Sequence, residues 1–276
     1  MRAVNQEWTC PEMYHRFTWT RVSHRRNWIS REYEPLQPYY LLQLSILAKA
    51  RTFVDVGANV GLYSVIMSQA VDRVHAYEAN GALVREAEFN FRSNNVVGTV
   101  QQVAVSRKAG TVVFGIVSRY AGDSAVIDGE GLQKDISEKK SVRSVCLDDE
   151  LQAVHGPVVL KIDVEGHEMA VLQGAKNMLK EKSCILQIED FNESADRYLG
   201  DLGYRRITKI GPDAYFTNDS SLQAVEAYEG AVARLIEANH ETKSMSFGRG
   251  PVSIVISGRV YDNVRGLARR FLRGRL

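Results

Sequence analysis

The sequence predicts an α/β fold with a mostly parallel sheet, and three observations support that prediction. Short apolar segments alternate with segments of helical composition through most of the chain. The first of the apolar segments, residues 52–57, ends in a glycine just before the next helix. Hydrophobic residues make up 45% of the 276 residues, which is typical of a globular protein with a large core. Strands that alternate with helices form βαβ units, and these units produce a parallel sheet.

The predicted elements begin with a helix over residues 36–50, where Leu41, Leu44 and Leu47 lie on one face at helical spacing. Further strands are predicted at 52–57, 73–78 and 99–105, and further helices at 61–70 and 80–95. This spacing is that of a parallel sheet whose strands are connected by helices.

The alternation stops between residues 106 and about 156. Residues 111–117 and 141–147 have the composition of strands, and a glycine-containing acidic segment, 121–131, separates them. We expect an insertion beside the main sheet rather than a second domain. The alternation then resumes, with strands predicted at 157–163, 184–190 and near 214–218, and helices at 166–180, near 196–203 and at 222–240. A last short strand is expected at 250–258.

Several classes of protein are excluded by composition. No apolar run approaches the roughly 18 residues that a transmembrane helix needs. The first residues contain no apolar segment of the kind found in secretory signals. The three cysteines form no C-x-x-C pair, so neither a zinc ribbon nor a redox motif is indicated, and a reducing compartment is expected. These observations predict a cytoplasmic protein.

The net charge of +2 is unevenly distributed. Residues 1–31 carry a net charge of +4 and residues 259–276 one of +5, so the body between them is acidic, at −7. We expect three parts: an aromatic and basic N-terminal extension (1–35), a cofactor-binding domain (36–220) and a C-terminal helical region (221–276) with a basic amphipathic tail.

The two basic ends allow two interpretations each. The apolar residues of 259–273 follow helical spacing between arginines, so this segment either packs on the body or contacts an anionic membrane surface from the cytoplasmic side. Residues 1–31 contain all three tryptophans, which suits a cover over an acceptor or a subunit contact. Nucleic acid is not expected as a partner, because the body is acidic and no RNA-binding motif is present. The oligomeric state is left open.

A glycine loop connects the first strand of the sheet to its helix. Gly57 allows a tight turn and Gly61 allows close packing where the helix begins, while Asn59 replaces the middle glycine of a dinucleotide fingerprint. Asp55 precedes the loop, and Glu78 ends the next strand at the spacing where a carboxylate accepts ribose hydroxyls. Acidic side chains here disfavour a pyrophosphate and suit a cationic nucleoside. S-adenosylmethionine fits, whereas a nicotinamide oxidoreductase is disfavoured.

A second acidic motif spans residues 158–168. Lys161 interrupts an apolar strand, and alternation places it on the same side as Asp163 and Glu165. A buried lysine needs a charged partner, and Asp163 is the nearest candidate. His167 begins the next helix, and Glu189 closes the next strand at the same edge of the sheet.

These residues are the candidates for chemistry on an acceptor. Asp163, Glu165 or His167 can take a proton from a hydroxyl, and Lys161 and Glu189 can bind the acceptor. The D-x-E-x-H spacing is also compatible with a divalent metal ion, although we do not predict one. A structural ion pair between Lys161 and Asp163, and a role for the residues after Glu189 in capping a helix, remain alternatives.

The segments DVGANVGLYS (55–64) and LKIDVEGHEMAVLQGA (160–175) resemble the FkbM family of S-adenosylmethionine-dependent O-methyltransferases. The resemblance covers about residues 50–220. It implies the class I methyltransferase (Rossmann-like) fold, with a seven-stranded, mostly parallel sheet, helices on both faces and the last strand antiparallel. The family's cofactor-binding positions correspond to Asp55, Gly57, Asn59, Gly61 and Glu78. In a third motif, at the end of the strand predicted at 99–105, the family's adenine contact corresponds to Ala104.

The resemblance implies transfer of a methyl group from S-adenosylmethionine to a hydroxyl, and we expect the acceptor to be a sugar in a glycan or glycolipid. A polyketide-type small molecule is the alternative acceptor. A partner protein that binds the cofactor without catalysis is the alternative of another class.

Overall fold

The computed structural model describes residues 37–117, 124–127, 136–189, 193–220, 244–246 and 253–255. The chain divides into two compact units. One is continuous, Lys49–Asp219, and the other combines residues 1–48 with 220–276. The continuous unit contains both sheets that are relevant to function.

Within the described part of the continuous unit, seven strands form one sheet in the order β10-β11-β9-β8-β1-β2-β3. Their bounds are β1 Thr52–Val56, β2 Arg73–Glu78, β3 Gly98–Gln102, β8 Val158–Ile162, β9 Cys184–Glu189, β10 Arg205–Ile210 and β11 Asp213–Thr217. Neighbouring strands from β3 to β9 are parallel, and β11 is antiparallel to both β9 and β10. The predicted mostly parallel α/β fold is confirmed.

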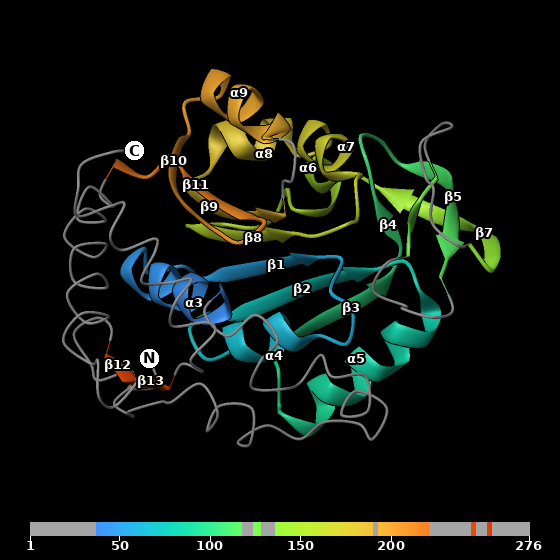
Figure 1. Cartoon of the computed structure of the whole chain (residues 1–276), viewed down its shortest axis with the longest axis horizontal. Coiled ribbons are helices and arrows are strands. Elements are labelled where there is room, and N and C mark those ends of the chain that lie inside the picture. Colours follow the sequence, from blue (N-terminus) through green and yellow to red (C-terminus); the bar gives the residue numbers. More distant parts are fainter. Residues whose placement is uncertain are drawn as a thin grey trace. The chain divides into compact units, whose positions relative to one another are not determined.

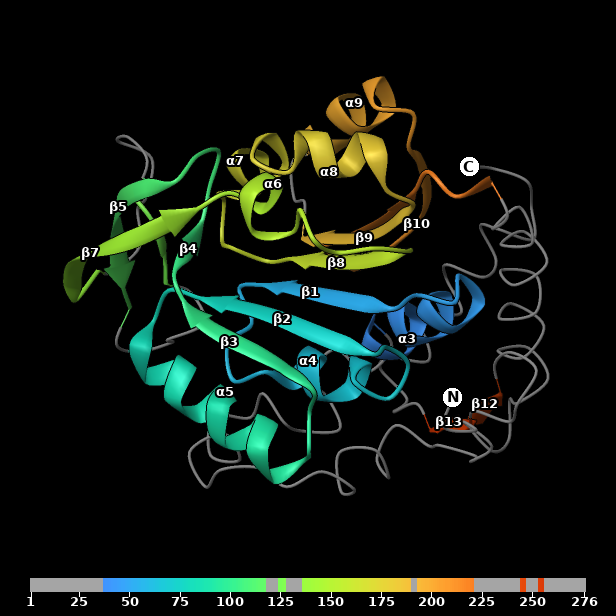
Figure 2. The ribbon, with the colours of Figure 1, turned by 180° about the vertical axis from the view of Figure 1, so that it is seen from behind.

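Helices cover both faces of this sheet, as Figures 1 and 2 show from opposite sides. One face carries α4 (Leu62–Met67) and α5 (Gly81–Ser93). The other carries α6 (Leu147–Glu150), α7 (Glu168–Gln173), α8 (Lys176–Glu181) and α9 (Ser194–Asp201). Strands covered on both faces are expected to be almost wholly apolar, so any polar residue within them needs a specific explanation.

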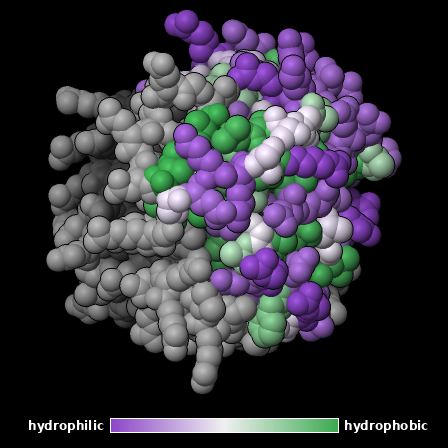
Figure 3. All heavy atoms as spheres, turned by 90° about the vertical axis from the view of Figure 1, so that its right-hand side faces the viewer, coloured by the Kyte–Doolittle hydropathy of each residue, from purple (hydrophilic) through white to green (hydrophobic). Residues whose placement is uncertain are grey.

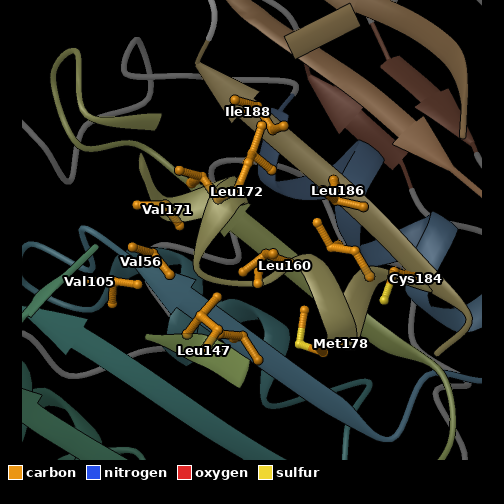
Figure 4. Packing of buried hydrophobic residues seen from close by; sticks show 14 of the residues in the cluster. Val56, Val105, Leu147, Leu160, Val171, Leu172, Met178, Cys184, Leu186 and Ile188 are labelled. Atoms are coloured by element: carbon orange, nitrogen blue, oxygen red, sulfur yellow. The ribbon is translucent and has the colours of Figure 1, made fainter. Parts of the chain in front are cut away.

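The larger hydrophobic core lies between the sheet and the helices α6 to α9 (Figure 4). Val56, Leu160 and Leu186 reach it from three neighbouring strands, and Leu172 and Met178 reach it from the helices. Each of these side chains is at most 3% exposed, and burying one contributes about 1.5–3 kcal/mol. This packing fixes the strand ends where the candidate site residues lie.

The predicted insertion is confirmed as a separate four-stranded sheet, in the order β4-β7-β5-β6. Its strands are β4 Ala104–Val105, β5 Gly110–Ile116, β6 Ala125–Val126 and β7 Glu138–Val145. Phe114, Val126 and Val142 pack together in a small core of their own. On the side of the molecule that Figure 3 shows, hydrophilic side chains are interspersed with smaller hydrophobic groups.

Two predicted elements are each divided in the structure. Residues 99–105 do not form one strand. The N–H of Val103 donates both to the carbonyl of Glu78 and, in a tight turn, to the carbonyl of Gln101, and the chain then passes from β3 into the small sheet. The helix predicted at 166–180 breaks at Gly174. A Cβ there would lie 2.1 Å from the carbonyl oxygen of Ser106, so the chain passes this point only as glycine.

In the other unit, the helix predicted at 36–50 is present as α3 (Gln37–Leu47), and β12 (Ser244–Ser246) pairs antiparallel with β13 (Ser253–Val255). The N-terminal extension, the helix at 222–240 and the basic tail lie outside the described residues, so the predicted three-part division stays a prediction. Among the described helices, none combines the length and the apolar character that crossing a membrane requires.

Candidate active site

The glycine loop passes directly over the end of β8. Gly57 has a φ of +78°, and its N–H donates to the carbonyl of Tyr77. A Cβ at Gly57 would lie 1.8 Å from the carbonyl oxygen of Asp163, and the N–H of Asp163 donates to Val56. Glycine is therefore required here both by the backbone conformation and by the close approach of the second motif. The two motifs that the sequence analysis singled out are in backbone contact.

The loop continues through two more residues in the left-handed region, Asn59 (φ +54°) and Gly61 (φ +79°). The N–H of Asn59 donates to Glu78 Oε2 at 2.8 Å, and the N–H of Asn80 donates to Glu78 Oε1 at 2.7 Å. The Glu78 carboxylate thus connects the glycine loop to the end of β2. Each of its oxygens accepts one backbone bond and keeps capacity for a second.

Glu78 is 7% exposed, and burial raises its pKa to about 7, although the two backbone bonds oppose that shift. The negative charges of Asp163 and Asp55 add a smaller contribution in the same direction as burial. A carboxyl group with this pKa gains or loses its proton near neutral pH, so its ligand binding depends on pH.

Asp55 is buried, and its Oδ2 accepts hydrogen bonds from the N–H and the hydroxyl of Ser64 at the start of α4. Burial raises its pKa, and the charge of Lys161 opposes the shift. Two oxygens at the loop, Asp55 Oδ1 and Asn59 Oδ1, are buried without a hydrogen-bond partner among the described residues. Buried acceptors are normally satisfied, so these two suit a ligand that brings donors, such as the ammonium and hydroxyl groups of S-adenosylmethionine.

The predicted pairing of Lys161 with Asp163 is confirmed. Lys161 Nζ lies 2.9 Å from Asp163 Oδ2, and the side chains are 5% and 25% exposed respectively. Asp163 is therefore open to a ligand while Lys161 is not. Direct binding of the acceptor by Lys161 stays a prediction.

Three carboxyl groups converge at this edge of the sheet. Asp163, Glu165 and Glu189 each offer an oxygen within 4.8 Å of the others, an arrangement that can hold a metal ion, and we call them the acid cluster. Glu165 is in the left-handed region, with a φ of +57°. Burial, followed by the charge of Asp163 and a hydrogen bond to it, raises the pKa of Glu189 to about 9. This shift favours the protonated form of Glu189, which can donate a hydrogen bond.

His167 does not belong to the acid cluster. It is 6% exposed, and its Nε2 lies 2.9 Å from the hydroxyl oxygen of Ser106, at the end of β4. The D-x-E-x-H arrangement considered for a metal ion is therefore not formed, and Glu189 replaces the histidine. Glu168 accepts from the N–H of Gly166 at 2.9 Å, which closes the turn before α7. The role of His167 as a base stays a prediction.

Ala104 lies in the core of the small sheet, 5% exposed, and the partly buried Ala79 packs against the same core. Ala79 directly follows Glu78, so Ala104 is close in the fold to the end of β2. The adenine contact implied for Ala104 is not tested by the structure.

Three residues near the acid cluster were not anticipated. Gln187 Nε2 donates to the hydroxyl of Tyr63 at 2.9 Å and to Asp213 Oδ1 at 2.8 Å. Asp213 pairs in register with Glu189 across the antiparallel strands β11 and β9. Gln187 interrupts an apolar strand just as Lys161 does, so the same signal was present in the sequence. Asp213 is the first residue of β11. Because β11 is antiparallel to β9, the start of β11 lies at the edge where the parallel strands end, which the residue's place at the start of a strand does not indicate.

The arrangement combines a loop with buried acceptors on one side and a partly exposed carboxylate on the other. The loop suits the binding of a cationic nucleoside, and the acid cluster suits the removal of a proton from the hydroxyl of an acceptor. Because Gly57 touches the backbone of Asp163, a ligand on the loop lies next to the acid cluster.

Comparisons with known proteins agree with this arrangement. Residues 55–206 match the model of the methyltransferase FkbM domain. The chain is 28% identical over 136 residues to the hexuronic acid methyltransferase AglP of Haloferax volcanii, covering 48% of this chain and 53% of that protein. The match therefore spans about half the length of this curated relative.

Two solved structures show a weaker similarity to this chain. A methyltransferase FkbM from Methylobacillus flagellatus KT is 16% identical, with a TM-score of 0.43, and the match covers 75% of this chain and 50% of that one. An O-methyltransferase from Bacillus cereus in complex with SAH is 12% identical, with a TM-score of 0.45, covering 78% and 92%. The family model spans more than half of the chain and includes the glycine loop, Glu78 and Asp163, so the chain belongs to the FkbM methyltransferase family.

Proposed function

We propose that this protein is an O-methyltransferase that uses S-adenosylmethionine and a sugar hydroxyl as acceptor. The observation that carries the proposal is the contact between Gly57 and Asp163, which places a cofactor loop beside a partly exposed carboxylate. Family membership supports methyl transfer, and the hexuronic acid methyltransferase among its relatives supports a sugar acceptor.

The residues that would hold the cofactor are those of the loop and of the end of β2. Glu78 would accept the ribose hydroxyls, and the unpartnered oxygens of Asp55 and Asn59 would accept from donors on the rest of the molecule. When bound, S-adenosylmethionine would supply an electrophilic methyl group, whose bond to sulfur would break as its bond to the acceptor oxygen forms, leaving a neutral thioether. The chain holds the reacting atoms together, which is the main source of catalysis in such transfers.

The acid cluster would handle the proton. Asp163, ionised beside Lys161, accepts the hydrogen of the acceptor hydroxyl, and protonated Glu189 donates a hydrogen bond to a neighbouring oxygen. Glu165 supplies a further acceptor for the remaining hydroxyls of a sugar. Several hydroxyls on one ring match several carboxyl groups at one edge of the sheet.

The chemistry of the acid cluster favours a hydroxyl over a carboxylate as the methylated group. A hexuronic acid offers both kinds of oxygen, but its carboxylate has no proton to lose. A carboxylate would also be repelled by Asp163 and Glu165. We therefore expect an ether product rather than a methyl ester.

The proposal is tested by incubating the full-length protein with isotopically labelled S-adenosylmethionine and three acceptors: a neutral oligosaccharide, a glucuronic acid-containing oligosaccharide and a phenol. We expect mass spectrometry to show a labelled methyl group on a sugar, resistant to mild alkali. A label removed by mild alkali would show an ester, and label on the phenol alone would favour a small-molecule acceptor.

Cofactor use is tested separately by calorimetric titration with S-adenosylmethionine. We expect binding that is weakened by the double substitution Asp55→Ala and Glu78→Ala. Unchanged binding in this variant would contradict the assignment of the loop. Binding without transfer to any acceptor of the panel would favour the non-catalytic partner protein.

A further inference from the structure

A row of polar side chains crosses the centre of the main sheet. Asp55 is in register with Lys161, and Lys161 is in register with Gln187, so the three side chains lie on one face of three neighbouring parallel strands. They are 1%, 4% and 0% exposed. Ser64 of α4 binds Asp55, so this is the face that α4 covers. Polar groups at such depth are costly unless their contacts are specific.

The contacts of this row lead to the acid cluster. Lys161 Nζ lies 2.9 Å from Asp163 Oδ2 and 4.7 Å from the centre of the Tyr63 ring. The Tyr63 hydroxyl accepts from Gln187, and Gln187 also donates to Asp213. A cation over an aromatic face is attracted to it, most strongly where water is absent. Tyr63, from the helix that follows the glycine loop, therefore holds the Lys161 ammonium group in place beneath Asp163.

The position of Lys161 sets which carboxyl group of the acid cluster is in contact with a positive charge. Three carboxyl groups whose oxygens lie within 4.8 Å do not all ionise at neutral pH, because like charges at this distance repel. The cation pairs with Asp163, and an opposite charge in contact with a carboxyl group favours its ionised form. Burial is the largest cause of the raised pKa of Glu189, and the charge of Asp163 adds to it.

We infer that Lys161, held by Tyr63 and Gln187, is a positioning residue that keeps Asp163 oriented as the proton acceptor. The inference rests on the proposed function and deepens it. It gives Lys161 a role through Asp163 rather than in direct contact with the acceptor, and it adds Tyr63 and Gln187 to the site. Among the residues that the structure describes, the charged groups that interact with Asp163 or Glu189 include Lys161, Asp55, Glu78, Glu165, Glu168 and Asp213.

The first test is Lys161→Met, with the exposed Lys180→Met as control. Loss of an opposite charge in contact with a carboxylate raises its pKa by about one unit or more. We therefore expect the acidic limb of the kcat profile, measured at saturating S-adenosylmethionine, to move to higher pH by about that amount. An unmoved limb in folded Lys161→Met, with activity reduced equally at all pH values, would overturn the inference.

The second test does not depend on an acceptor or on the folding of Lys161→Met. The carboxyl carbons of Asp and Glu are labelled with carbon-13 and titrated by NMR, with Asp163→Asn and Glu189→Gln identifying the two signals. Tyr63→Phe loses the hydroxyl that accepts a hydrogen bond from Gln187. Its control, Tyr204→Phe, loses a hydroxyl that donates to the carbonyl of Leu179. We expect the titrations of Asp163 and Glu189 to shift in Tyr63→Phe and not in Tyr204→Phe.

The two tests separate this inference from the proposed function. If the wild-type protein transfers no methyl group, the proposed function fails, and the carboxyl titrations still decide whether the contacts of Lys161 and Tyr63 act on Asp163. If transfer is observed and both the pH limb and the carboxyl titrations are unaffected by the substitutions, the positioning role is wrong and the proposed function stands.

Discussion

The carbonyl of Asp163 occupies the space that a side chain on Gly57 would need. Two motifs separated by about a hundred residues in the sequence therefore meet through their backbones, with no side chain between them. The consequence is that the glycine loop and the acid cluster cannot shift independently of each other.

This contact predicts a large effect of a small substitution. Gly57→Ala places a Cβ against the Asp163 carbonyl at a φ of +78°, so we expect a loss of about 3 kcal/mol or more in the free energy of unfolding. Urea denaturation measures it. Gly200→Ala is the control, because Gly200 is exposed in α9 with nothing near its Cβ, and alanine there should stabilise by about 0.5–1 kcal/mol. Equal stability of the two variants would contradict the close approach.

Glu78 predicts that cofactor binding depends on pH. Its pKa is raised to about 7 in the free protein, and only the ionised form accepts hydroxyl donors with both oxygens, so binding requires loss of the proton. The affinity for S-adenosylmethionine should rise about tenfold between pH 6 and pH 8. Calorimetry in two buffers of different ionisation enthalpy would show proton release near pH 6.

The control for this prediction is Glu78→Gln, which cannot ionise. We expect its affinity to be lower than that of the wild type at pH 8 and nearly independent of pH.

The raised pKa of Glu78 also affects the stability of the fold. Protonated Glu78 contributes stability below the unfolded pKa of 4.5 that is lost as the pH rises through 7, so Glu78→Gln should gain stability relative to the wild type over that interval.

Asp163→Asn preserves the shape of the side chain but removes the carboxylate that would take the proton from the acceptor hydroxyl. We expect kcat to fall by about a hundredfold or more, with the affinity for S-adenosylmethionine within a factor of a few of the wild type. Steady-state kinetics at saturating cofactor would measure it. Asp72→Asn is the control, since Asp72 forms an exposed ion pair with Arg51 and should not affect activity. Full activity in Asp163→Asn would exclude it as the base.

The contact between His167 and Ser106 predicts that the histidine anchors the small sheet to the turn before α7. We expect His167→Gln, whose amide can still reach the Ser106 hydroxyl, to retain most of the methyl transfer. Ser106→Ala should lower stability by about 1 kcal/mol, the usual cost of a buried hydrogen bond. Thermal unfolding and initial rates measure the two effects. A base role for His167 would instead show as a loss of transfer in His167→Gln with normal stability.

The order and type of most elements could be predicted because periodicity and glycine position depend on local sequence. The pairing of Lys161 with Asp163 was also predictable, since a buried charge in a strand requires a near partner. What could not be predicted were contacts set by the packing of distant segments. Ser106 reaches His167 from the end of β4, which belongs to the small sheet, and position 174 accepts only glycine because the Ser106 carbonyl lies beside it.

Tyr63 and Gln187 show a different limit. Gln187 interrupts the apolar strand 184–189, which is the signal that identified Lys161, but an amide carries no charge and so suggested no chemistry. Its significance comes from Tyr63 on α4, which the sequence places far from it. Site residues that act through others are found by following contacts outward from the charged groups.

The reversed direction of β11 has a consequence for engineering this protein. Because β10 runs toward the same edge as β9 and β11 returns from it, the tight turn at Gly211 and Pro212 opens beside Glu189 and Asp213. Residues added to this hairpin would extend the wall next to the acid cluster without interrupting any parallel strand or the larger core. The turn is therefore a natural position for loop libraries that aim to redirect the protein to new acceptors.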